Sequence, residues 1–138
     1  MPSDRKHTLP RAVWALALLY CAASLLHFAH NAEYIAFYPN MPAWITRETV
    51  YRVWLAITGV GVLGAACALC GWRVAAALCL MAYGAFGFDG LGHYWLALCS
   101  QHTFAMNFSI LFEVCAGAAL IAACVWALRQ TPTRSGAV

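Results

Sequence analysis

Charged side chains are scarce in this sequence: they make up 9% of its 138 residues, whereas hydrophobic residues make up 64%. An ordinary soluble domain has roughly 25% charged and 45–50% apolar residues. So few charges cannot cover the surface of a water-soluble domain, which is rich in charged side chains. The composition therefore predicts that lipid surrounds much of the chain, and the length is enough for one domain, residues 1–138.

Basic residues are also too few and too scattered for a nucleic-acid-binding surface. The net charge is +3, but the lysine and arginine residues flank the apolar segments and form no row along any of them. This distribution is typical of a membrane-topology signal, whereas nucleic-acid binding requires basic residues gathered on one face. We therefore expect no nucleic-acid partner.

Cysteine is present, but not in a pattern that predicts a disulfide framework. The seven cysteines are odd in number and most lie in apolar surroundings. Cys67, Cys70, Cys79 and Cys124 fall near the inner ends of the predicted helices, where they raise the possibility of a thiolate site. Their helical angles do not extend the polar faces described below, so we interpret them as small packing residues.

Four apolar stretches are long enough to cross a bilayer, which takes about 20 helical residues. They cover about residues 12–36, 50–72, 74–97 and 104–128. Pro39 and Pro42 interrupt the chain after the first stretch and predict the only long loop, with Thr46 as the N-cap of the next helix. The other connections are short turns, which make consecutive helices antiparallel neighbours. We predict an all-α integral membrane protein, a four-transmembrane-helix antiparallel bundle.

The lysine and arginine residues predict the orientation of this bundle. Six of them share the side that holds both termini and the turn at Gly71: Arg5, Lys6, Arg11, Arg73, Arg129 and Arg134. Only Arg47 and Arg52 fall on the other side. Since an excess of lysine and arginine marks the cytoplasmic side, we expect a multi-pass protein of the cell inner membrane with both termini cytoplasmic.

The outer half of the bundle is predicted to be polar, whereas the inner half is almost purely apolar. Residues that share a helix face recur with the helical repeat, and three helices carry such a polar row. The rows are Tyr20, Ser24, His27, Asn31, Tyr34 and Tyr38, with His30 at the edge; Asp89 and His93; and His102, Met106, Ser109 and Glu113.

The free-energy cost of an ionised side chain in a membrane indicates which way these rows face. A carboxylate at the centre of a membrane helix costs about 2.5–3.5 kcal/mol, and Glu113 lies near the middle of its span. We therefore expect the polar rows to face the interior, where ionisable groups commonly mark function. The plain alternative is that they are hydrogen-bonded struts between helices.

Transition-metal binding is the first functional hypothesis. Imidazole and carboxylate ligands together suit zinc, iron, nickel or copper(II) better than calcium or magnesium. The candidate ligands are His27, His30, Asp89, His93, His102 and Glu113. The sequence thus predicts a buried His/carboxylate site that binds or handles Zn, Fe, Cu or Ni.

Three alternatives use the same residues. The first is a membrane-embedded enzyme that performs acid–base chemistry on a lipidic substrate, with Asp89 orienting His93 and Glu113 carrying a proton. The second is a haem-binding redox subunit with His27 and His93 as axial ligands. The third is an accessory subunit in which the polar rows only join helices. The lipid bilayer is the expected partner in each case, with a metal ion or a lipidic small molecule as the possible ligand.

Overall fold

The computed structural model describes residues 9–130, which form helices, turns and loops without any strand. Four segments in this range are long and apolar enough to cross a membrane: Arg11–Glu33, Arg47–Leu69, Arg73–Leu96 and Phe104–Arg129. The predicted number of candidate spans is confirmed, and their bounds lie close to those expected from the sequence. Three basic residues of the topology prediction, Arg5, Lys6 and Arg134, fall outside the described residues.

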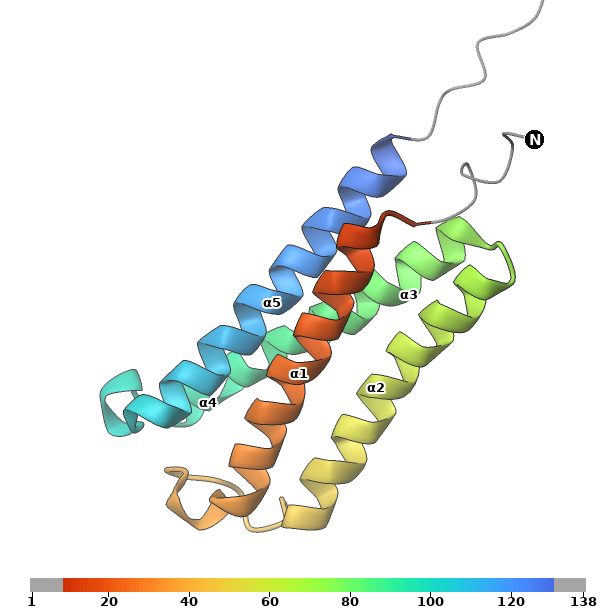
Figure 1. Ribbon diagram of the computed structural model, residues 1–138. Coiled ribbons are helices and arrows are strands. Elements are labelled where there is room, and N and C mark those ends of the chain that lie inside the picture. Colours follow the sequence, from red (N-terminus) through yellow and green to blue (C-terminus); the bar gives the residue numbers. More distant parts are fainter. Residues whose placement is uncertain (1–8, 131–138) are drawn as a thin grey trace, which may run out of the picture.

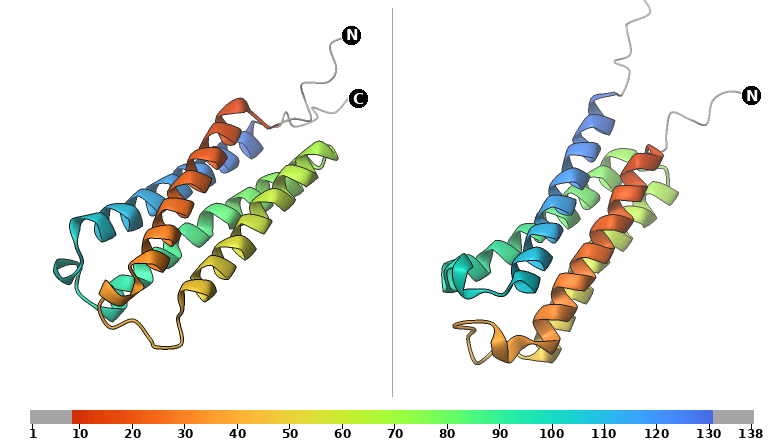
Figure 2. Two further views of the ribbon diagram at one scale, coloured as in Figure 1. Left: turned by 60° about the horizontal axis from the view of Figure 1, so that its bottom comes forward. Right: turned by 60° about the vertical axis from the view of Figure 1, so that its left-hand side comes forward.

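The long helices lie side by side as a bundle (Figure 1). They are α1 (Arg11–Glu33), α2 (Arg47–Leu69), α3 (Arg73–Ala85) and α5 (Phe104–Arg129). Helices α1 and α3 each pack against both α2 and α5, so every long helix has two main neighbours. One end of the bundle holds the start of α1, the α2–α3 turn and the end of α5 (Figure 2). The opposite end, which we call the loop end, carries residues 34–46 and 97–103.

Local sequence explains where α2 and α5 begin and where the chain turns between α2 and α3. The side chain of Thr46 accepts a hydrogen bond from the backbone N–H of Thr49 (3.3 Å), so the predicted N-cap of α2 is confirmed. Thr103 caps α5 in the same way, with Met106 N–H as donor (3.3 Å). Gly71 has φ 79° in the α2–α3 turn, a left-handed conformation that glycine adopts without steric cost.

The third span is not the regular helix that the sequence predicts over residues 74–97. Helix α3 ends at Ala85, the chain continues as a 3₁₀ helix, η3 (Phe86–Gly92), and a short helix, α4 (His93–Leu96), completes the span. A 3₁₀ helix has three residues per turn, so residues four apart are rotated by about a third of a turn. The side chains of Asp89 and His93 are therefore turned apart about the helix axis: Asp89 is exposed and His93 is buried.

Glycines allow this span to lie very close to α1 and α5. A Cβ atom on Gly87 would be 2.8 Å from Tyr20 Cε2 and 3.1 Å from the backbone carbonyl oxygen of Glu113. A Cβ atom on Gly84 would be 2.8 Å from the backbone carbonyl oxygen of Gly117 in α5. The backbones thus touch at these glycines, which brings the polar faces of three helices together.

Candidate functional site

Most of the polar side chains predicted to face the interior do so, and they gather near the loop end. Exposure is 3% for His27, 8% for His93, 7% for His102 and 1% for Glu113. His30 is only half-buried, and Asp89 is exposed. The helical repeat therefore predicts the inward faces of α1 and α5 correctly, because both of these helices are regular along their length.

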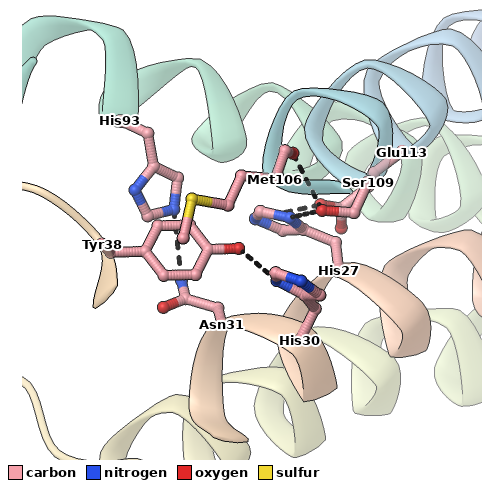
Figure 3. Close-up of polar contacts among 8 residues, drawn as sticks. All are labelled: His27, His30, Asn31, Tyr38, His93, Met106, Ser109 and Glu113. Carbon is pink, nitrogen blue, oxygen red and sulfur yellow. Dashed lines mark hydrogen bonds and ion pairs between the residues drawn. The ribbon is translucent and has the colours of Figure 1, made fainter. Parts of the chain in front are cut away.

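His27 and Glu113 form the innermost contact of this set. His27 Nε2 lies 3.8 Å from Glu113 Oε2, and His27 Nδ1 lies 3.2 Å from the Ser109 hydroxyl oxygen (Figure 3). Ser109 donates its single hydroxyl hydrogen to the Met106 carbonyl oxygen (3.0 Å). Ser109 must then accept from His27, which places a hydrogen on Nδ1 and directs the Nε2 lone pair of the neutral ring at Glu113.

The surroundings of Glu113 indicate that this pair holds one proton. Both carboxyl oxygens are buried and have no hydrogen-bond partner among the described residues. An isolated carboxylate in such a place is very costly, whereas one proton held either on Glu113 or on His27 Nε2 leaves the pair neutral overall. The proton can sit on either atom without bringing net charge into the membrane, so the pair is suited to store and transfer a proton.

Two further histidines continue from this pair toward the loop end. The Asn31 amide donates to His93 Nε2 (3.1 Å), so the neutral His93 ring carries its hydrogen on Nδ1. His102 Nδ1 donates to the Leu98 carbonyl oxygen (3.0 Å), and its buried Nε2 has no partner among the described residues. Ring centroids are 5.6 Å apart for His27 and His93 and 6.2 Å apart for His93 and His102. The three rings therefore form a row that begins at Glu113.

Tyr38, which lies in the loop after α1, packs against this row of histidine rings. The sequence places Tyr38 on the α1 stripe, but α1 ends at Glu33 and the chain folds back after the 3₁₀ turn η2 (Ile35–Phe37). The Tyr38 ring lies 4.8 Å from the His93 ring, and its hydroxyl is 2.9 Å from His30 Nδ1 (Figure 3). Burial raises the pKa of Tyr38 to about 12, so the phenol keeps its proton and can donate it to His30.

A pocket of about 390 Å³ lies beside the histidine row. Its polar lining consists of His27, Asn31, Thr49, Asp89 and His93, and its apolar walls come from α1, α2, the long loop and α4. The pocket thus brings together three of the predicted site residues: His27, Asp89 and His93. Glu113 lies behind His27 and does not line the pocket, and neither do His30 and His102.

The metal and haem hypotheses stay predictions. Within residues 9–130, no group of three or more His, Cys, Asp or Glu side chains is arranged to hold a metal ion. The imidazole nitrogens instead face different partners: Glu113 for His27 Nε2, Asn31 for His93 Nε2 and the Leu98 carbonyl for His102 Nδ1. These contacts do not direct the nitrogens at a common centre, and they favour proton chemistry over ligation.

The contacts that Ser109, Asn31 and Tyr38 make with the histidines were not predicted from the sequence. Ser109 and Asn31 each fix the hydrogen position on one histidine, and Tyr38 covers the row. Ser109 and Asn31 share helix faces with the histidines, a spacing that could have identified them as their partners. No comparable signal exists for Tyr38, because its contacts depend on the path of the loop.

Comparisons with protein-family models, with curated proteins and with solved structures gave no match. The geometry of the site is therefore the basis for assigning a function.

Proposed function

We propose that this chain is a membrane-embedded protein that binds a lipidic small molecule in the pocket and exchanges a proton with it through the His27–Glu113 pair. One observation carries the proposal: His27 lines the pocket and also contacts Glu113. Both carboxyl oxygens of Glu113 are buried, so a proton passes between Glu113 and a bound molecule by way of the His27 ring.

The chemistry of this pair is acid–base transfer. The pair, which holds one proton, gives that proton from His27 Nε2 to one carbon of an electron-rich double bond in the bound molecule. A proton that leaves another carbon of the same molecule then returns to the pair, which completes an isomerisation without any oxidant or reductant. Positioned groups of this kind contribute about 10²–10⁴-fold to a reaction rate.

The walls of the pocket support an apolar ligand. Phe28, Ile45, Val50, Val53 and Leu96 contribute to the lining, and all of them except Ile45 belong to candidate membrane spans. Small-molecule sites usually have volumes of about 300–1,000 Å³, with mostly apolar walls and a few polar groups. A lipidic molecule fits this description and can enter from the bilayer.

Filling the pocket tests the binding part of the proposal. In Val53→Trp, the indole replaces a small side chain of the pocket wall, so molecules that co-purify with the wild type should be lost by about tenfold or more. Mass spectrometry of lipids extracted from protein in polymer-bounded native membrane discs gives the measurement. Leu55→Trp, an exposed position on the same helix outside the pocket lining, is the matched control. An identical set of molecules in the wild type and in Val53→Trp would contradict binding in this pocket.

We also propose an antiparallel bundle in the inner membrane, with both termini cytoplasmic and the loop end outside. Among the described basic residues, Arg11, Arg73 and Arg129 belong to the end opposite the loops, and Arg73 Nη2 donates to the Ala127 carbonyl oxygen there (2.6 Å). Reporter fusions at Thr46 and at the C-terminus should therefore give opposite locations. Two reporters on the same side of the membrane would contradict this topology.

A further inference from the structure

The pocket contains a carboxylate that forms no ion pair with any of the described residues. Asp89 lines the pocket within the candidate span Arg73–Leu96. The ion pairs among residues 9–130 are His27 with Glu113 and Arg47 with Glu33, so Asp89 has no basic partner in the described part of the chain. An ionised side chain at this level costs free energy unless it is paired, and such residues commonly mark ligand or ion sites.

A second hydrogen-bond acceptor belongs to the same pocket wall. Asn31 is 9% exposed, and its amide nitrogen is used by His93. Its carbonyl oxygen, Oδ1, is buried and has no hydrogen-bond partner among the described residues. A buried acceptor without a donor is unfavourable, so a ligand that donates hydrogen bonds is favoured beside Asp89, and it satisfies Asn31 Oδ1 where the Asn31 side chain turns toward the pocket.

Aromatic side chains add a preference for positive charge. Trp44 and Trp95 line the pocket, and they are 73% and 93% exposed. An ammonium group is attracted to the face of an indole ring, and more strongly where water is partly excluded. The pocket therefore combines a carboxylate and two indoles with apolar walls.

We propose that the ligand of this pocket is a cationic amphiphile, a molecule with a protonated primary amine joined to an apolar chain. The ammonium group pairs with Asp89, and the chain lies against the apolar walls of α1 and α2. This assignment rests on the proposed function, since it names the ligand class of the same pocket. An alcohol of the same chain length offers a donor but no charge, and Asp89 repels a carboxylate head.

The test compares three probes with one chain length: a long-chain primary amine, the corresponding alcohol and the corresponding carboxylic acid. The full chain is placed in nanodiscs of phosphatidylcholine, whose zwitterionic surface does not itself concentrate the amine. Native mass spectrometry measures the fraction of protein that carries each probe. We expect the amine to bind about tenfold more tightly than the alcohol, and the acid to bind least.

Variants of two carboxylates identify the source of this preference. Asp89→Asn should remove the preference for the amine, and Asp89→Glu should retain most of it. Glu48→Gln is the matched control, because Glu48 is an exposed carboxylate outside the pocket lining and its loss should leave the preference unchanged. Melting temperatures of the variants show whether each one is folded.

The remaining outcomes separate this inference from the proposed function. Equal binding of the three probes, all blocked by Val53→Trp, would overturn the cationic ligand and leave the pocket as the binding site. A preference for the amine that survives Asp89→Asn would also overturn it. Binding that Val53→Trp does not change for any probe would overturn both.

Discussion

Gly117→Ala is expected to destabilise the bundle by about 2–3 kcal/mol, although it adds a single methyl group. A Cβ atom at this position would overlap the backbone carbonyl oxygen of Gly84, where α5 crosses α3. Backbone atoms cannot move aside as a flexible side chain can, so the two helices must separate along their contact. A fall in melting temperature, followed by circular dichroism in detergent, measures the effect.

Gly59→Ala provides the matched control for this prediction. Gly59 also lies in a long helix, but a Cβ atom there would have no heavy atom within 4 Å. Alanine is a better helix former than glycine by about 1 kcal/mol, so this variant should be as stable as the wild type or more stable. Equal melting temperatures for the two variants would show that α3 and α5 do not meet at their glycines.

The spans and the inward faces of two helices could be predicted from the sequence because both depend on local rules. A run of apolar residues is a property of the segment itself, and so is an N-cap such as Thr46. The rows on α1 and α5 follow from a constant angle per residue, which these helices keep throughout. Burial of His27 and Glu113 was therefore predictable from each helix alone.

The third span departs from the regular helical repeat, so its faces could not be predicted from local sequence. The expected shared face of Asp89 and His93 assumed α-helical geometry, whereas residues Phe86–Gly92 wind as a 3₁₀ helix. The close contact of Gly87 with Tyr20 and with the backbone of α5 is a tertiary feature, and no periodic pattern encodes it. The position of Asp89 in the pocket wall thus depends on packing between helices.

Likewise, the contacts between side chains of different helices could not be predicted from the sequence. His27 could have met any polar group of a neighbouring helix, and its contact with Ser109 and Glu113 depends on how far α1 and α5 are shifted along each other. The pocket walls are ordinary apolar residues such as Val50 and Val53, which carry no signature of a cavity. A single sequence predicts which groups are buried, but the partners follow only from the packed structure.

Glu113→Gln is expected to abolish proton transfer while leaving the bundle folded. Glutamine has nearly the same size as glutamate, and its amide can occupy the same position beside His27 Nε2. The amide cannot give up or take a proton near neutral pH, so the pair can no longer store a proton. The rate of transfer to a bound molecule should fall by about 10²–10⁴-fold, the usual contribution of a positioned acid or base.

Deuterium exchange measures this loss even when the substrate is unidentified. The protein is incubated in D₂O with a total lipid extract of the producing cells, and mass spectrometry detects deuterium bound to carbon after exchangeable sites are washed back with water. Wild-type protein should label one class of lipid, because a proton removed from carbon at His27 is replaced by a deuteron from the pair. Glu48→Gln makes the same chemical change at an exposed site away from the pocket and should label the lipid at the wild-type rate. Labelling by Glu113→Gln at that rate would remove the pair from the chemistry, and its burial would then serve only to join α1 to α5.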